Sequence, residues 1–162
     1  MRDFFPIIEL KGKPYEMGKA HGRGLAKEIK ANLDLYFMMI RGLTGLEPQQ
    51  CLTHASQVLD VIQNERPQVI LMNGGTGITK KDVTIEAVNP LFGKTLTGFG
   101  PLFAKLSFDE IGSAAFLSRA TAGVIEDTVV FCMPGSLNAC KLACRELIFP
   151  ELGHLVKHVT EG

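Results

Sequence analysis

The stretch "LMNGGTGITKKDVT", from Leu71 to Thr84, decides the fold of this chain. It places four small residues, Gly74 to Gly77, directly after the apolar run "QVILM". At the carboxyl end of a parallel strand the backbone can turn its N–H groups outward, and glycine lets a ligand approach closely. Such a loop suits phosphate, although the spacing is neither that of a Walker A loop nor the GxGxxG of a dinucleotide fold. An ordinary strand-to-helix turn is an equally good interpretation of GGTG alone.

A carboxylate and a hydroxyl follow the glycines, at Asp82 and Thr84 in "KKDVTIEAV". We expect a helix from Thr84 to Leu91. Asp82 can cap that helix, or it can hold Mg²⁺ beside a triphosphate. Capping is the favoured interpretation from the residues alone, because Asp is preferred at helix starts for local reasons.

The pattern of strand, loop and helix occurs a second time. The apolar run "TVVFCM", Thr128 to Met133, leads into "PGSLNAC", where Ser136 or Asn138 could begin the last helix. Strands that alternate with helices predict a parallel sheet with crossover helices, and therefore an α/β layer architecture. Loops at neighbouring strand ends form the walls of a ligand site in such a sheet, and two phosphate-friendly loops fit a ligand with several phosphates.

The segment before residue 67 has a different pattern. "PIIELKGKP" predicts a short strand and a turn, and apolar residues from Met17 to Ile40 recur at spacings of three and four, which predicts a helix ending near Gly42. A second helix is expected from Pro48 up to Arg66. We therefore predict a mainly helical segment over residues 1–66 and an α/β domain over residues 67–162.

Composition excludes several classes of protein. The chain has 162 residues, with 17 basic and 17 acidic side chains spread evenly over both halves, so nothing points to nucleic acid or to an anionic membrane. No apolar run approaches the roughly 18 residues that a membrane span needs. Its four cysteines lack CxxC spacing and are expected to be buried thiols of a soluble, cytoplasmic protein.

Residues 69–159, with "NGGTGITKKDVTIEAV", "GFGPLFAKLSFDEIGSAAFLSRATAGV" and "FCMPGSLNACKLACRELIFPELGHLVKH", resemble the molybdenum-cofactor biosynthesis family of the MoaB and Mog type. The resemblance implies a molybdopterin-binding fold, with three layers around a parallel or mixed sheet. It also implies assembly as homo-trimers or hexamers. Active members of the family use Mg²⁺ and ATP to adenylylate molybdopterin.

The resemblance also implies roles for individual residues. Asp82 would be the metal-binding and catalytic carboxylate, and Ser118 and Arg119 would line the pterin or phosphate pocket, since an arginine fork pairs with phosphate in two places. The protein would mainly position two anions and neutralise the charge that develops. The residues implied to bind molybdopterin or ATP are Gly74, Gly75, Thr76, Gly77, Thr84, Ser113, Ser118, Arg119, Pro134, Gly135, Ser136 and Asn138.

The front of the chain departs from this family. It lacks the expected opening strand of the type "ILTVSD" and the second acidic motif, and we expect no parallel strand from it except within "FFPIIEL". Residues 6–69 instead resemble the amino-terminal segment of penicillin acyltransferase-type N-terminal-nucleophile hydrolases, but no cysteine follows at the place of the nucleophile. The chain is thus interpreted as a fusion of two fragments near residues 67–70. A non-catalytic molybdopterin-binding or oligomer-forming module, and an acyltransferase fragment, are the alternative functions.

Three further pairs of residues are candidate sites. His154 and His158 are four residues apart, a spacing that can hold zinc, but a solvated helix face is the favoured interpretation. Cys140 and Cys144 share that spacing and are expected in the core. The acidic pair at residues 109–110 is expected on a helix surface, with Glu110 as a hypothetical substitute for the missing acidic motif.

Overall fold

The computed structural model describes residues 7–8, 37–41 and 50–161 of the chain. Within these residues, six strands form one sheet in the order β1-β2-β3-β6-β5-β4. The strands are β1 (Ile7–Ile8), β2 (Phe37–Arg41), β3 (Val69–Asn73), β4 (Lys94–Thr95), β5 (Thr121–Ile125) and β6 (Thr128–Met133).

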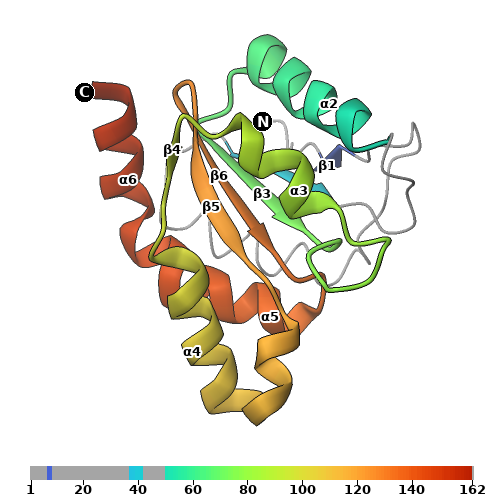
Figure 1. Ribbon diagram of the computed structural model, residues 1–162. Coiled ribbons are helices and arrows are strands. Elements are labelled where there is room, and N and C mark those ends of the chain that lie inside the picture. Colours follow the sequence, from blue (N-terminus) through green and yellow to red (C-terminus); the bar gives the residue numbers. More distant parts are fainter. Residues whose placement is uncertain (1–6, 9–36, 42–49, 162) are drawn as a thin grey trace.

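Helices connect and cover these strands (Figure 1). The α-helices are α2 (Gln50–Glu65), α3 (Thr84–Val88), α4 (Phe99–Ile111), α5 (Leu137–Leu142) and α6 (Phe149–Glu161). Two short 3₁₀ segments, η1 (Asn89–Leu91) and η2 (Gly112–Leu117), and one π-helical turn, η3 (Ala143–Ile148), continue them.

The sheet is mixed. Strands β1, β2, β3 and β6 run parallel to one another, whereas β5 is antiparallel to β6 and β4 is antiparallel to β5. In the centre, β3 pairs with β6 from Val69 opposite Val129 to Asn73 opposite Met133. Both central strands therefore end at the same edge of the sheet, and the loops that follow them start side by side.

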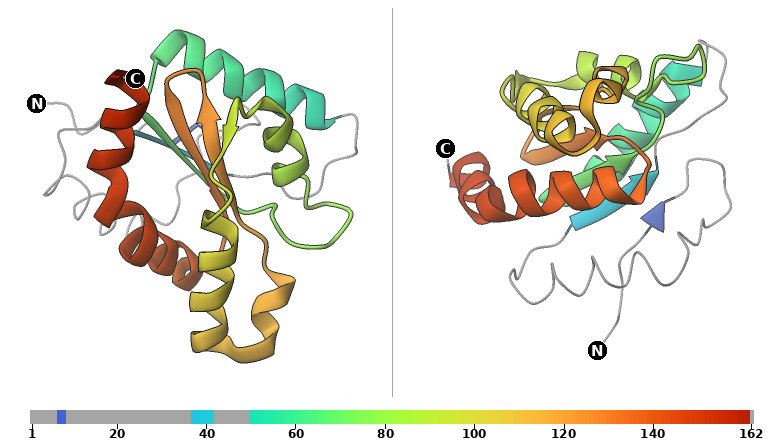
Figure 2. Two further views of the ribbon diagram at one scale, coloured as in Figure 1. Left: turned by 60° about the vertical axis from the view of Figure 1, so that its left-hand side comes forward. Right: turned by 90° about the horizontal axis from the view of Figure 1, so that it is seen from below.

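Alternate residues of the two central strands enter two separate cores. Val69 and Leu71 pack with Phe131 against α4, α5 and α6, and Ile70 and Met72 pack on the other face against α2 and α3. Because both faces are covered, these strands are continuous apolar runs, with a polar residue only at one end of each, and do not alternate with polar residues. Figure 2 shows the resulting layers, with α2 and α3 on one side of the sheet and α5 and α6 on the other. The predicted three-layer α/β fold is confirmed.

One predicted helix is wrong in its last turn. The helical pattern was expected to run past Ile40, but Phe37–Arg41 forms β2 and pairs with β3 residue by residue, from Val69 to Asn73. The expectation that only "FFPIIEL" could supply a parallel strand is therefore also wrong, although Ile7–Ile8 within it does form β1. A short run such as "FMMIR", with four apolar residues, fits either period, and pairing with a buried strand decides in favour of the extended form. The remainder of that predicted helix lies outside the described residues.

The predicted second helix is confirmed as α2, whose Val58, Val61 and Ile62 pack under the sheet. The boundary between residues 66 and 67 stays a prediction. No helix of the described residues is long and apolar enough to cross a membrane.

The last predicted helix is interrupted. Between α5 and α6 the backbone widens into a π-helical turn, in which the N–H of Phe149 donates to the carbonyl of Cys144 five residues earlier. Pro150 follows immediately and has no N–H to donate, so the helix resumes there with a proline in its first turn, where the missing donor costs least.

Candidate functional site

Two loops meet at the carboxyl ends of β3 and β6. We call Gly74–Gly77 the glycine loop and Pro134–Ser136 the PGS loop. The N–H of Gly74 donates to the carbonyl of Met133 over 2.9 Å, which ties the loops at their start. A Cβ placed on Gly135 would lie 3.1 Å from the Cα of Gly74, so the two backbones touch. The predicted juxtaposition of the two loops is confirmed.

The glycine loop has a backbone that only glycine adopts readily. The φ angles of Gly74 and Gly75 are 86° and 65°, in the left-handed region. Thr84, the first residue of α3, holds both carbonyls from one side: its hydroxyl donates to Gly74 O and its N–H donates to Gly75 O, each over 2.9 Å. Thr84 is buried, so these bonds are shielded from water.

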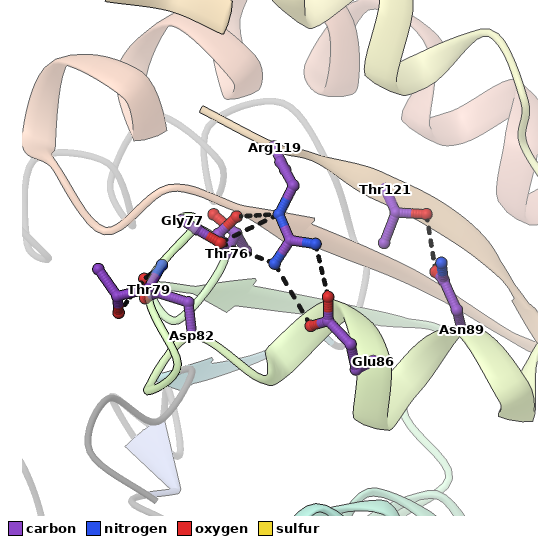
Figure 3. A network of polar contacts seen from close by, with 8 residues as sticks. All are labelled: Thr76, Gly77, Thr79, Asp82, Glu86, Asn89, Arg119 and Thr121. Carbon is purple, nitrogen blue, oxygen red and sulfur yellow. Dashed lines mark hydrogen bonds and ion pairs between the residues drawn. The ribbon is translucent and has the colours of Figure 1, made fainter. Parts of the chain in front are cut away.

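Arg119 holds the other half of the loop. Its Nε donates to the carbonyl of Thr76 over 2.9 Å and to that of Gly77 over 3.0 Å, and its Nη2 donates to Gly77 O over 2.7 Å. Its outer nitrogens bind the Glu86 carboxylate, with Nη1 at 2.5 Å from Oε1 and Nη2 at 3.3 Å from Oε2 (Figure 3). Arg119 is thus brought to the predicted loop, but in this structure it contacts the backbone carbonyls.

All four carbonyls of the glycine loop therefore accept hydrogen bonds, whereas most of the amides near them have no acceptor among the described residues. Gly74 N is bonded to Met133, whereas the N–H groups of Gly75 through Ile78 make no hydrogen bond to any other described residue. A row of backbone N–H groups without acceptors among the described residues, on a loop whose carbonyls are all occupied, is suited to an anion.

Asp82 lies against the glycine loop but does not cap α3. The residue at the helix start is Val83, with no side-chain cap, and Asp82 Oδ2 instead accepts from Thr79, at 2.7 Å from Oγ1 and 3.0 Å from N. The capping interpretation is therefore wrong, because a turn within Thr79–Asp82 competes for the carboxylate. A Cβ on Gly77 would come within 2.8 Å of Asp82 Oδ2, so glycine is what admits the carboxylate there.

Glu86 and Thr79 were not found from the sequence. Thr79 stands three residues before Asp82, which is a local turn signal that could have been used. Glu86 has no such signal, since its partner Arg119 lies 33 residues away. The hydrogen bond from Arg119 lowers the pKa of Glu86, so the ion pair is charged at neutral pH.

The PGS loop is fixed by local contacts. Ser136 begins α5 as predicted: its Oγ accepts from the N–H of Ala139 at 3.3 Å. The thiol of Cys140 donates to Pro134 O over 3.3 Å. Gly135 and Ser136 are exposed, which leaves them accessible to a ligand.

The remaining predicted binding residues lie outside these contacts. Ser113 is in η2 and Ser118 ends it, and the side chain of neither makes a hydrogen bond to another described residue. Asn138 lines a separate groove of about 380 Å³, together with Glu110, Lys141, Leu142, Arg145 and Glu146. The structure thus joins the glycine loop, Asp82, Thr84, Arg119 and the PGS loop, and it does not tie Ser113, Ser118 or Asn138 to them.

The structure also places the other candidate pairs. Cys140 and Cys144 are buried as expected, and burial raises the pKa of Cys140 to about 11 and that of Cys132 to about 12. His154 and His158 are exposed, with their Nε2 atoms 2.8 Å apart.

The acidic pair at residues 109–110 is on the surface as expected, and Asp109 accepts from Lys105 at 2.7 Å. No group of three His, Cys, Asp or Glu side chains among the described residues is close enough to hold a metal ion.

Comparison with known proteins identifies the family that the chain is similar to. Residues 52–154 match the family model of the probable molybdopterin binding domain. The chain is 56% identical over 105 residues to molybdenum cofactor biosynthesis protein B of Bacillus subtilis, an overlap of 64% of this chain and 62% of that protein. It is 40% identical over 141 residues to the Staphylococcus carnosus protein of the same name, an overlap of 86% of this chain and 81% of that one.

Solved structures give the same result. A crystal structure of molybdenum cofactor biosynthesis protein B superposes with a TM-score of 0.70 and 36% identity, over 81% of this chain and 99% of the other. The tungsten cofactor synthesizing protein MoaB of Pyrococcus furiosus superposes with a TM-score of 0.62 and 31% identity, over 78% and 98% of the two chains. The matches with the Bacillus relatives span only about three fifths of those proteins' length. None of these matches shows the acyltransferase resemblance of residues 6–69.

Proposed function

The chain belongs to the family of probable molybdopterin binding domains, and we propose that it binds molybdopterin at the glycine loop and the PGS loop during molybdenum cofactor biosynthesis. The names of its relatives support a molybdopterin-related biosynthetic function. One observation of the structure supports these two loops as the binding site. The amides of Gly75–Ile78 have no acceptor among the described residues, while every carbonyl of the glycine loop has a donor. The phosphate of molybdopterin is the acceptor that we assign to them.

The PGS loop completes the binding surface. It touches the glycine loop through Gly135, and its exposed Ser136 presents a hydroxyl at the same edge of the sheet. In α/β folds, ligands bind outside the carboxyl ends of the strands, where β3 and β6 end. Molybdopterin would thus lie between the backbone amides of the glycine loop and the PGS loop, which offers its backbone and the hydroxyl of Ser136.

We further propose that the chain adenylylates molybdopterin with Mg-ATP. A terminal phosphate oxygen of molybdopterin attacks the α-phosphorus of ATP, the new phosphoanhydride bond forms, and the bond to the β-phosphate breaks with release of pyrophosphate. The chain's contribution is to hold the two anions in line. Asp82 would be the protein ligand of Mg²⁺, which neutralises the phosphates when bound. One or two carboxylates suffice for Mg²⁺ when phosphates and water supply the other ligands, so Asp82 fits the ion.

One observation favours a binding module without catalysis. The Asp82 carboxylate is already bonded twice to Thr79, and no group of three potential metal ligands surrounds it among the described residues. A chain with this arrangement would bind molybdopterin and leave ATP unbound. The two functions differ in a single measurable step.

Mass spectrometry of a reaction mixture separates them. The chain is incubated with molybdopterin, ATP and Mg²⁺, and adenylylated molybdopterin is sought, with Asp82→Asn as the matched variant. Product that falls at least about 100-fold in Asp82→Asn supports catalysis at this carboxylate. Molybdopterin binding without product supports the binding module, and absence of molybdopterin binding overturns both.

We also propose that the chain assembles as a homo-trimer or hexamer in the cytoplasm. Its support is an apolar surface of α4 and η2, which Figure 1 shows projecting beyond the sheet. This surface exposes Leu102, Phe108, Ile111, Phe116 and Leu117, with 76% of Phe116 accessible. Exposed apolar residues gathered on one projection mark an association surface. Light scattering on the purified chain, with Phe116→Ser as the variant, should give a trimer or hexamer that the substitution dissociates.

The fusion origin of residues 6–69 remains a separate proposal. Its support is the resemblance of "PIIELKGKPYEMGKAHGRGLAKEI" to an unrelated family. The match to the Staphylococcus carnosus protein covers 141 residues, which is more than residues 67–162 contain, so it extends into the segment before residue 67. This overlap argues against a fusion. Resequencing the coding region across residues 60–75 tests whether the junction is real.

A further inference from the structure

We infer that Arg119 is a positioning residue that aims the amides of the glycine loop at the ligand and does not itself bind the ligand's phosphate. This inference rests on the proposed function for the identity of the ligand. It differs from the role that family resemblance implied, in which the arginine fork pairs with phosphate. The geometry around the guanidinium distinguishes the two roles.

The planarity of the peptide bond links each carbonyl to the next amide. In a trans peptide the C=O of one residue and the N–H of the following residue point in opposite directions. Because Arg119 binds the carbonyls of Thr76 and Gly77, the N–H groups of Gly77 and Ile78 point away from it. Thr84 acts in the same way on Gly74 and Gly75, and therefore turns the next two amides away from itself. Arg119 through its side chain, and Thr84 through its hydroxyl and its own N–H, thus orient four consecutive amides.

The guanidinium has no free edge for phosphate. Its Nε and Nη2 are used by the loop carbonyls, and its Nη1 and Nη2 by Glu86. To pair with phosphate through two nitrogens, Arg119 would have to release the loop carbonyls or the Glu86 carboxylate. Glu86 also neutralises its charge, so the pair adds little attraction for an anion.

The outer nitrogens of the Arg119 guanidinium are bound to Glu86 on α3, and this contact fixes the orientation of the guanidinium. A second hydrogen bond nearby runs from the hydroxyl of Thr121 on β5 to Oδ1 of Asn89, which begins η1 directly after α3, over 2.9 Å (Figure 3). Arg119 is therefore held between the start of β5 and α3, with the loop carbonyls at its inner edge. A lysine has one ammonium and could not bridge two carbonyls and a carboxylate.

The first test needs no ligand. Backbone order parameters from ¹⁵N relaxation are measured for Gly75–Ile78 in the wild-type chain, in Arg119→Gln and in Lys105→Gln, whose lysine forms an exposed ion pair on α4. We expect order parameters of about 0.85 in the wild type and the Lys105 control, and values below about 0.6 in Arg119→Gln. Unchanged order parameters in Arg119→Gln would overturn the inference, even if molybdopterin does not bind and the proposed function fails.

The second test measures the affinity for molybdopterin. The two roles of Arg119 predict different changes in this affinity for the same variants. If Arg119 is a positioning residue, Arg119→Gln and Arg119→Lys should each weaken molybdopterin binding about 10-fold or more. The control Lys105→Gln should bind molybdopterin as the wild type does. Glu86→Gln leaves affinity equal or weaker, because the fork loses its anchor.

If Arg119 instead bound phosphate, Arg119→Lys would keep most of the affinity, and Glu86→Gln would strengthen binding by removing a competing anion. Either of these results, in a chain whose wild type binds molybdopterin, would overturn the inference.

Discussion

The glycine loop and the PGS loop both follow a central parallel strand, but they are held in different ways. The carbonyls of Thr76 and Gly77 depend on Arg119, 43 and 42 residues away, and on its partner Glu86. The PGS loop depends on contacts within six residues, from Ser136 to Ala139 and from Cys140 to Pro134. A loop held by distant side chains can place its amides for a ligand only once the sheet has formed. A loop held by its own helix start forms with that helix.

The largest effect is expected where the two loops touch. Gly135→Ala places a Cβ 3.1 Å from the Cα of Gly74, and backbone cannot move aside as a flexible side chain can. We expect a loss of about 1–3 kcal/mol in the free energy of unfolding, measured by urea denaturation. Gly98→Ala is the matched control, because nothing lies within 4 Å of a Cβ there. Equal stability of the two variants would show that the loops do not need their contact.

The next effect tests the support of the glycine loop alone. Thr84→Val keeps the side-chain shape but leaves the carbonyl of Gly74 without its donor in a buried place. An orphaned buried acceptor costs about 1–3 kcal/mol, and we expect the lower part of that range because the N–H of Thr84 still binds Gly75. Urea denaturation of Thr84→Val beside Thr97→Val, on an exposed threonine, measures it. If Thr84→Val loses no more stability than the Thr97→Val control, the hydroxyl of Thr84 does not hold the glycine loop.

A smaller effect tests the PGS loop. Ser136→Ala removes the hydroxyl that accepts from the N–H of Ala139, and loss of such a cap costs about 1 kcal/mol. Ser136→Asn should restore most of the stability, since asparagine caps equally well. Thermal unfolding of the two variants gives the comparison. If Asn and Ala behave alike, the local cap does not hold this loop.

The smallest effect is a pH dependence of the Arg119–Glu86 pair. The pKa of Glu86 is lowered by Arg119, so the pair stabilises the fold above the unfolded value of 4.5, and this contribution disappears as the pH falls through the lower folded pKa. Both side chains are partly exposed, at 36% and 48%, which limits the contribution to about 1 kcal/mol at most. The stability difference between the wild type and Glu86→Gln should therefore shrink from pH 7 to pH 3. A difference that is the same at both pH values would contradict it.

The sequence predicts those parts of the fold that have local signals. The apolar runs of β3 and β6, the period of α2 and the serine at the start of α5 were all found in this way. The run "FMMIR" differs from the predicted helix, because its four apolar residues carry no distinct period and its strand conformation depends on pairing with β3.

The site shows the same division. The glycines and the PGS loop were identified from their residues, and their contact follows from the parallel pairing of β3 with β6. The direction of Arg119 and the part played by Glu86 were not predicted, since both depend on how β5 packs beside α3. The carboxylate of Asp82 was misassigned to helix capping because Thr79, in the turn before it, competes for the same oxygen.

The most direct test of the central claim is a ¹H–¹⁵N NMR titration of the labelled chain with molybdopterin. We predict saturable shifts of the amide signals of Gly75–Ile78, accompanied by shifts in the PGS loop. These amides have no acceptor among the described residues, and a bound phosphate would give them one. Shifts confined to other elements, such as α6 or the groove beside Asn138, would contradict the claim that the glycine loop binds the ligand, as would the absence of any shift.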